Sequence, residues 1–207
     1  TEIPKQENSS NEKNEPQNEE KKLEVSIPNN WTKDTVSWLI ESESDAKIYF
    51  MTNDTNLSQE EWGTYTDATQ WDNGGSIPEG IRYIKFWAVR KDKKTNKEIV
   101  AVSEAKTYML DTSKPEDFEL EYVIEGNKTY IRNKTKIRDT YSNNLVLYYN
   151  IHNHNTTLYN SVRDIKNNCK PLTTVNDEND FSIECDAKYD VRTDITVYVI
   201  DEVGNFK

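Results

Sequence analysis

Short runs of alternating apolar and polar residues make up most of the chain after residue 22. A period of two residues predicts β-strands with one face in a core. No stretch keeps an apolar period of 3.6 residues over ten or more positions, so few and short helices are expected. Val36, Trp38 and Ile40 share one predicted face. The predicted strands cover residues 23–28, 35–41, 47–51, 81–89 (with Ile84, Phe86 and Ala88 on one face), 99–110, 118–124, 128–137, 144–152, 181–185 and 194–201.

The strand pattern stops at a polar, proline-bearing stretch, DTSKPE (111–116), and then restarts. The restart predicts two domains, at residues 23–113 and 114–207, each close to the roughly 100 residues of an immunoglobulin-type sandwich. Strands at this spacing, without helices between them for parallel crossovers, favour antiparallel sheets. We therefore predict an all-β fold with two tandem immunoglobulin-like antiparallel β-sandwiches.

Residues 1–22 are different in character, with no aromatic residue and only one large aliphatic residue, Ile3. Such a segment cannot bury enough apolar surface to offset the entropy lost on ordering, so a disordered polar linker is predicted. Its Glu and Lys content would also suit a helix, but no apolar stripe is present to dock one.

The charge balance narrows the choice of partners. The chain has a formal net charge of -11 and a sequence pI near 4.8, which argues against nucleic-acid binding because phosphate contacts need clustered Lys and Arg. Membrane insertion is not expected either, since apolar runs such as 144–149 fall short of the roughly 18 to 20 residues of a spanning helix. The chain starts at Thr1 without a signal core, so a processed or excised form is expected.

Five motifs follow one another along the chain. They are a Trp-Thr pair, an aromatic segment in mid-domain, a strand that begins with Glu-Gly, an Asp-Thr-x-x-Pro junction and a strand followed by Asp-x-x-Gly-Asn. Together they resemble the Big-type immunoglobulin-like repeats of Gram-positive cell-surface proteins. The resemblance implies an extracellular location, at the cell surface or secreted. The segments that carry it are IPNNWTKDTVSWLI (27–40), EEWGTYTDATQW (60–71), EGIRYIKFWAV (79–89), YMLDTSKPEDF (108–118) and VYVIDEVGN (197–205).

The resemblance also has two departures. Arg90 stands where the family has the Asp of a hairpin turn, so the turn in the first unit must be built differently. Residues 152–193 fit the pattern poorly and suggest an elaborated insertion.

The last segment predicts a tight hairpin, because Asp201, Gly204 and Asn205 have the turn chemistry that such a reversal needs. In the family, a final strand follows this turn, and the second unit has no counterpart to it in this sequence. We expect that the parent protein continues, or that another chain supplies the strand by β-augmentation. Both interpretations predict an exposed sheet edge.

Two cysteines, Cys169 and Cys185, lie 16 positions apart in the second unit. In an exported protein such a pair predicts a disulfide, which for a loop of about 15 residues would contribute roughly 3 kcal/mol in the chain-entropy model. The alternative is a pair of reduced thiols. A metal site is not expected at the cysteines, because no Cys-x-x-Cys pair is present.

Aromatic residues close together in a turn-rich segment suggest a ligand site, because exposed rings stack on sugars. Trp62, Tyr65 and Trp71 are the candidates for binding a glycan or a host extracellular protein. The alternative is that they are packing residues of the fold. His152 and His154 lack a carboxylate spaced to complete a metal site, and the NDEND stretch (176–180) lacks the EF-hand glycine, so neither metal nor cofactor is expected.

No nucleophile elbow, phosphate-binding glycine loop or His-Glu-x-x-His motif is present, so an enzyme is not expected. We predict a non-enzymatic spacer segment of a bacterial surface or secreted protein, with neighbouring domains of the parent protein as partners. The alternatives are an adhesin module and an accessory domain of a surface hydrolase. Fold alone does not separate these functions.

Overall fold

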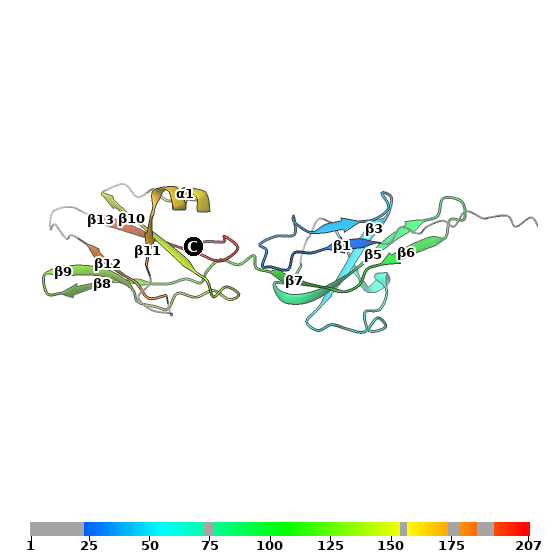
Figure 1. The fold of residues 1–207 in the computed structure, drawn as a ribbon, viewed down its shortest axis with the longest axis horizontal. Helices are drawn as coiled ribbons and strands as arrows, with labels where there is room; N and C mark the ends of the chain where they lie inside the picture. Colours follow the sequence, from blue (N-terminus) through cyan, green and yellow to red (C-terminus); the bar gives the residue numbers. More distant parts are fainter. Residues whose placement is uncertain (1–22, 73–76, 154–156, 174–178, 186–192) are drawn as a thin grey trace, which may run out of the picture.

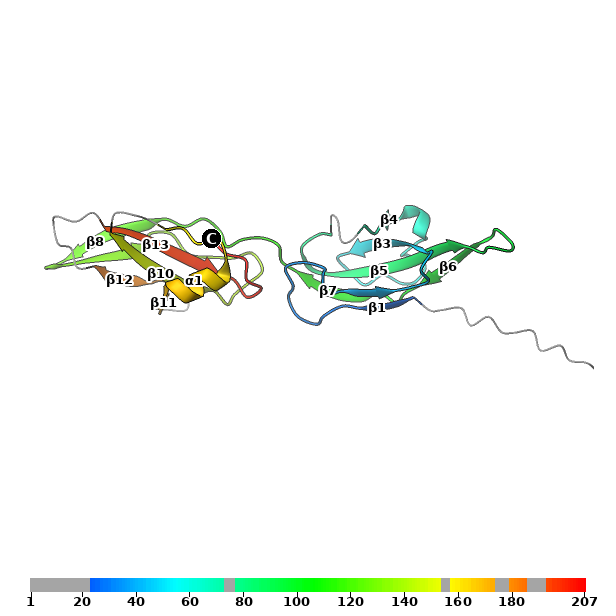
Figure 2. The ribbon, with the colours of Figure 1, turned by 90° about the horizontal axis from the view of Figure 1, so that it is seen from above.

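The computed structural model describes residues 23–72, 77–153, 157–173, 179–185 and 193–207. The linker predicted at residues 1–22 lies outside the described residues. The described elements are mainly antiparallel strands arranged in several sheets, which confirms the predicted all-β sandwich fold. Figures 1 and 2 show two β-rich parts end to end along the long axis. We call residues 23–113 the first unit and residues 114–207 the second unit, keeping the predicted boundary.

In the first unit, a small sheet of β1 and β2 packs across a core from a five-stranded sheet. The order in the larger sheet is β4-β3-β5-β6, and β7 pairs with β5 as well. A short 3-10 helix, η1, covers Tyr65–Asp67. The strands are β1 (Glu24–Ser26), β2 (Leu39–Glu41), β3 (Lys47–Asn53), β4 (Thr69–Gln70), β5 (Gly80–Lys91), β6 (Glu98–Val102) and β7 (Lys106–Leu110).

The core of the first unit follows the predicted faces in one strand and departs from them in another. Ile84, Phe86 and Ala88 are all buried in one cluster, as predicted. Val36 is 89% exposed, because the predicted strand 35–41 begins only at Leu39 and the backbone turns before it, with Trp38 N donating to Thr35 O. The face predicted for Val36 is therefore wrong.

The predicted strand 99–110 is two strands, β6 and β7, which both pair with β5. Their registers on β5 differ by one residue, so the break at Ser103 works as a bulge. Ser103 N donates to Phe86 O at 3.0 Å, and Phe86 N donates to Ser103 Oγ at 3.0 Å. The serine side chain therefore satisfies a backbone group that the bulge would leave unpaired.

The second unit contains two three-stranded sheets, with orders β12-β9-β8 and β11-β10-β13. Both sheets contribute to one core, with Ile131 and Ile183 from the first sheet and Leu147, Val197 and Val199 from the second. The elements are β8 (Leu120–Glu125), β9 (Lys128–Asn133), β10 (Val146–Asn153), α1 (Val162–Asn168), β11 (Lys170–Leu172), β12 (Ser182–Cys185) and β13 (Thr193–Ile200).

The helix α1 covers the outer face of the β10-β13 sheet. Ile165 packs there with Tyr198 and Ile200, which point away from the sandwich core. Ser161 begins the helix, because its side chain accepts a hydrogen bond from Asp164 N at 3.1 Å. Because α1 covers the outer face of β13 and the sandwich core covers the inner face, both faces of this strand are apolar. None of the helices in the described part of the chain is long and apolar enough to cross a membrane.

The predicted hairpin at the end of the chain is formed. Asp201 Oδ1 accepts hydrogen bonds from the backbone N–H groups of Val203, Gly204 and Asn205. Gly204 has a φ of 90°, which favours glycine because a Cβ would be strained there. Beyond the turn, Val199 and Lys207 exchange two backbone hydrogen bonds of 3.0 and 3.1 Å.

The turn after β5 is built around Asp92, two residues beyond Arg90. Asp92 Oδ1 accepts from Lys94 N at 3.0 Å and from Thr95 N at 2.7 Å. Asn96 adopts a φ of 56° and completes the reversal.

The predicted disulfide between Cys169 and Cys185 is not formed. Cys169 follows α1 and is buried with Ile165 and Tyr198, while Cys185 packs at the edge of the sandwich core on the other side of the sheet. Burial raises the pKa of the Cys169 thiol. The two cysteines therefore belong to different layers of the unit.

Reduction is accordingly expected to leave the stability of the second unit unchanged. A disulfide closing this loop would contribute about 3 kcal/mol, which reductant would remove. Thermal unfolding with and without dithiothreitol checks this, together with thiol titration of the denatured chain, where two thiols are expected. Absence of titratable thiols, combined with a lower melting temperature in reductant, would show that the disulfide exists.

Candidate functional site at the junction of the two units

An aromatic contact joins the two units. The rings of Trp31 in the first unit and Tyr141 in the second have centroids 5.5 Å apart and are tilted by 36°. Gly80 has a φ of 104°, and a Cβ placed on it would lie 3.6 Å from Tyr141 Cε1. The start of β5 therefore lies directly beside the tyrosine ring of the second unit.

A hydrogen bond links the terminal hairpin to the end of the first unit. Asn205 Nδ2 donates to Asp111 O at 3.1 Å, and Asp111 N donates to Thr32 O at 2.9 Å. Asp201 orients Asn205 by accepting from its backbone N–H. The Asp-x-x-Gly-Asn motif thus forms part of the contact between the units as well as a turn.

Three aspartates meet at this contact, each from a different loop. Asp111 follows β7, Asp139 lies between β9 and β10, and Asp201 follows β13. One carboxylate oxygen of each lies within 4.8 Å of the others. Asp111 is 1% exposed and Asp201 is 4% exposed, while Asp139 is half-buried. We call these three residues the junction cluster.

Backbone amides hold one oxygen of each carboxylate in the junction cluster. The second oxygens of Asp139 and Asp201 are buried and have no hydrogen-bond partner. A buried acceptor without a donor is costly, by about 1 to 3 kcal/mol and more for a charged group. The Oδ1 atoms accept from Ser113 N (Asp111, 3.1 Å), from Tyr141 N and Ser142 N (Asp139, 2.9 and 2.8 Å), and from Val203 N, Gly204 N and Asn205 N (Asp201, 3.0, 2.7 and 2.8 Å).

The three carboxylates of the junction cluster place negative charges close together. Burial raises the pKa of Asp111 to about 6, and the nearby carboxylates of Asp139 and Asp201 contribute to the same rise. Within the described residues, no lysine or arginine forms an ion pair with any of the three. The cluster therefore gathers acidic oxygens at a contact, and no basic side chain in the described part of the chain pairs with them.

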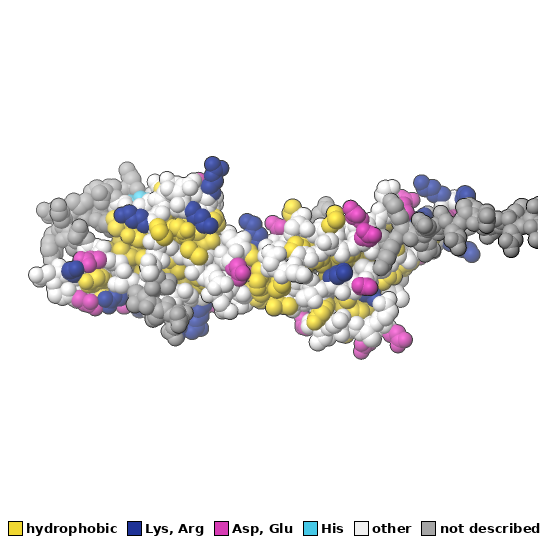
Figure 3. All heavy atoms as spheres, viewed as in Figure 1, with side chains coloured by type: hydrophobic (Ala, Val, Ile, Leu, Met, Phe, Trp, Pro, Cys, Tyr) yellow, Lys and Arg dark blue, Asp and Glu magenta, His cyan; other side chains and the backbone are white. Residues whose placement is uncertain are grey.

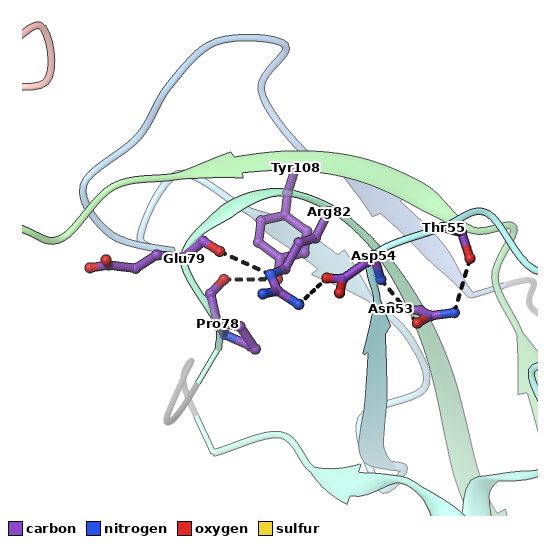
Figure 4. Close-up of polar contacts among 7 residues, drawn as sticks. All are labelled: Asn53, Asp54, Thr55, Pro78, Glu79, Arg82 and Tyr108. Atoms are coloured by element: carbon purple, nitrogen blue, oxygen red, sulfur yellow. Dashed lines mark hydrogen bonds and ion pairs between the residues drawn. The ribbon is translucent and has the colours of Figure 1, made fainter. Parts of the chain in front are cut away.

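A polar network around Glu79 fixes the segment between the units against the first unit. Glu79 accepts from Thr112 N at 3.0 Å and from Ser113 Oγ at 2.6 Å. Burial raises the pKa of Glu79, but the hydrogen bonds from Ser113 and Thr112 outweigh it, so the pKa lies below its ordinary value. Figure 4 shows Arg82 between Glu79 and Asp54, donating to the Glu79 carbonyl at 2.9 Å and pairing with the Asp54 carboxylate.

Tyr108 in the same network makes stability sensitive to alkaline pH. It is fully buried, its hydroxyl donates to Pro78 O at 2.9 Å, and burial raises its pKa to about 12. The unfolded chain loses this proton near pH 10, before the folded chain does, so the free energy of unfolding falls as pH rises from about 10 to 12. The expected loss is on the order of 3 kcal/mol.

The control for this prediction is Tyr108→Phe, which removes the ionisable group. The variant is expected to be about 1 kcal/mol less stable than the wild type at pH 8, because Pro78 O loses its donor. That gap should close and then reverse toward pH 12 in urea unfolding followed by tryptophan fluorescence. A gap that stays constant with pH would contradict the role of Tyr108.

The structure does not assemble the predicted aromatic ligand site. Trp62 is 1% exposed and its Nε1 donates to Leu57 O at 3.1 Å. Trp71 is partly buried against the core, stacked on Trp38 with centroids 6.1 Å apart. Tyr65 is also partly buried, and its hydroxyl donates to Glu98 Oε2 at 2.5 Å. These contacts identify Trp62 and Trp71 as packing residues and argue against a stacking surface for sugars.

Two other segments considered for metal binding are only partly described by the structure. His154 lies outside the described residues, as does most of the NDEND stretch. His152 is 8% exposed and its Nε2 is buried without a hydrogen-bond partner.

The junction cluster was not predicted from the sequence. Asp111 and Asp201 are the acidic residues of two motifs, Asp-Thr-x-x-Pro and Asp-x-x-Gly-Asn, which were interpreted as a linker and a turn. Asp139, in the stretch IRDTYSNN, carries no motif. Asp111 follows a predicted strand and Asp201 ends another, but nothing in the sequence shows that these two loops meet.

Comparison with known proteins adds no relative: no family model matches the chain, and no curated protein or solved structure is significantly similar to it.

Proposed function

We propose that this chain is a non-enzymatic spacer segment of a bacterial surface or secreted protein, made of two tandem immunoglobulin-like units that present a more specialised region. The observation that best supports the proposal is the junction, where Trp31 meets Tyr141 and Asn205 meets Asp111. A spacer needs neighbouring units that keep a set orientation. Specific contacts at the boundary provide this, whereas a bare flexible linker does not.

The surface is consistent with such a passive role. On the face shown in Figure 3, basic and acidic side chains are interspersed over both units, and no large patch of one charge forms. Interspersed charge favours solubility and does not create the basic footprint of a nucleic-acid-binding protein. The antiparallel ladders of both units also suit a mechanical role, because their hydrogen bonds resist shear together.

A second candidate, an adhesin module, is favoured by one exposed strand. β8 is an edge strand of its sheet, and its alternate apolar residues Leu120, Tyr122 and Ile124 are 38%, 70% and 77% exposed. An apolar edge can bind an extended segment of another protein by β-augmentation. In this interpretation the binding surface is β8 rather than the predicted aromatic residues.

Binding of the chain to an array of glycans and extracellular-matrix proteins separates the two functions. The spacer predicts no saturable binding by the folded, monomeric chain. The double variant Tyr122→Ser/Ile124→Ser tests the alternative, since both side chains are largely exposed and their replacement should leave the fold intact. Saturable binding that this variant abolishes would overturn the spacer in favour of the adhesin.

A further inference from the structure

We propose that Asp111, Asp139 and Asp201 bind one Ca²⁺ ion at the junction of the two units. One carboxylate oxygen of each lies within 4.8 Å of the others. Ca²⁺ binds oxygen at about 2.3 to 2.6 Å, so two ligands on opposite sides of one ion are about 4.6 to 5.2 Å apart. The three oxygens are therefore close enough to share a single ion after a small adjustment of the side chains.

The orphaned oxygens are an independent indication of a ligand. Asp201 is 4% exposed, its Oδ1 accepts three backbone N–H groups, and its Oδ2 is buried without a partner. Asp139 repeats this arrangement, with Oδ1 held by two amides and Oδ2 unpartnered. In each case the amides fix the carboxylate and leave one oxygen available. A cation would supply the favourable interaction that these oxygens lack.

The donor set selects the kind of ion. All three side chains offer carboxylate oxygen, and neither histidine nor cysteine belongs to the junction cluster, so a hard cation is favoured over Zn²⁺ or Cu²⁺. Ca²⁺ accepts six to eight oxygens in flexible geometry and can complete its shell with water and backbone carbonyls. Mg²⁺ demands near-ideal octahedral geometry at about 2.0 to 2.1 Å and gives up its waters reluctantly. A site built from three loops suits Ca²⁺ better.

The ion would connect the two units, because Asp111 ends the first unit and the other two ligands belong to the second. It would also neutralise the acidic oxygens that now face one another at the contact. Binding itself is independent of the spacer role, whereas the consequence that Ca²⁺ stiffens the segment rests on that proposed function.

Isothermal titration calorimetry of the full chain with CaCl₂ tests the site directly. We expect one Ca²⁺ per chain with a dissociation constant of about 10⁻⁴ to 10⁻³ M, the range of extracellular Ca²⁺ modules, and weaker binding of MgCl₂. Asp201→Asn and Asp139→Asn should each weaken binding by about tenfold or more, since ligand charge sets affinity. Both changes preserve Oδ1 as the acceptor of the backbone amides.

Asp92→Asn is the matched control, because Asp92 also accepts backbone amides through Oδ1 in a turn but lies outside the junction cluster. This variant should bind Ca²⁺ like the wild type.

Thermal unfolding provides a second measurement, which also shows whether the variants fold. Without Ca²⁺, Asp201→Asn should unfold at the same temperature as the wild type or higher, because it removes one of three neighbouring charges. With Ca²⁺, the wild type should gain several degrees and the variant should gain little. A wild type that neither releases heat with CaCl₂ nor gains stability would overturn the proposal. Unchanged binding by the folded Asp201→Asn and Asp139→Asn variants would overturn it too.

The failures of the two proposals are distinguishable. A chain that binds no Ca²⁺ but whose units tumble together in solution would overturn the ion site and leave the spacer. A chain that binds Ca²⁺ at the junction cluster while its units tumble independently would support the ion site and overturn the spacer.

Discussion

Replacing Trp71 by alanine is expected to destabilise the first unit by about 3 to 5 kcal/mol. Trp71 stacks on Trp38 and meets Phe50 and Phe86 edge-on, with centroids 5.4 and 5.3 Å away. Its loss leaves a cavity among three other aromatic rings, and aromatic pairs are worth about 0.5 to 1.5 kcal/mol beyond their buried area. Such a loss is a large part of the total stability of a domain of this size.

The measurement is urea unfolding followed by tryptophan fluorescence, which reports on the first unit because the remaining tryptophans, 31, 38, 62 and 87, all lie there. Val36→Ala is the control, since Val36 is 89% exposed and its change should fall within about 0.5 kcal/mol. A Trp71→Ala variant as stable as the wild type would contradict the packing role. If that variant also lost binding to a glycan, Trp71 would be a ligand residue after all.

The second large effect is expected at Asp201. Asp201→Ala removes the acceptor of three partly buried backbone amides in the terminal hairpin, whereas Asp201→Asn keeps that acceptor. Both variants lose the charge, so the loss of the Oδ1 acceptor is the main difference between them. We expect Asp201→Ala to be less stable than Asp201→Asn by about 2 to 4 kcal/mol, because each unsatisfied buried donor is costly.

Differential scanning calorimetry in the presence of a chelator is the appropriate measurement, because no bound cation then separates the two variants. Equal melting temperatures would mean that the turn does not depend on the side-chain acceptor. The same result would mean that the backbone amides at Oδ1 do not hold the Asp201 carboxylate in place, so its Oδ2 would not be fixed toward the junction cluster.

Periodicity predicted the fold class because the core residues follow it closely. Ile84, Phe86 and Ala88 alternate along β5 and are all buried, as are Val197 and Val199 along β13. These alternating residues face the two sandwich cores. The opposite faces are buried as well, with Lys85 and Trp87 in β5 and with Tyr198 and Ile200 in β13. Val36 shows the limit of this reasoning, because its apolar side chain lies in a turn that precedes the strand and is exposed to solvent.

Other features depend on tertiary context that local patterns do not contain. The seven residues of α1 are too few to show a helical period, although Ser161 and Asp164 form a helix start. The division of 99–110 into β6 and β7 depends on pairing with β5, which only the folded sheet reveals. The disulfide was predicted from sequence spacing, whereas opposite sides of a sheet separate Cys169 from Cys185.

The sequence did not predict the junction cluster, because the cluster also depends on tertiary context. Asp111, Asp139 and Asp201 are far apart in the sequence, and each has a sufficient local explanation as a turn residue. Only the end-to-end placement of the units (Figure 1) brings one carboxylate oxygen of each residue together. No metal site was expected from the sequence, because its histidine, cysteine and NDEND candidates lack complete ligand sets. The proposed Ca²⁺ site uses none of those candidates.

The most direct test of the spacer is whether the two units tumble as one body. Backbone ¹⁵N relaxation of the full chain in saturating Ca²⁺ measures the rotational diffusion of each unit separately. The junction contacts predict one shared, elongated diffusion tensor for residues of both units. Separate correlation times, each typical of an isolated domain of about 100 residues, would show that the junction does not fix the units and would contradict the proposed spacer.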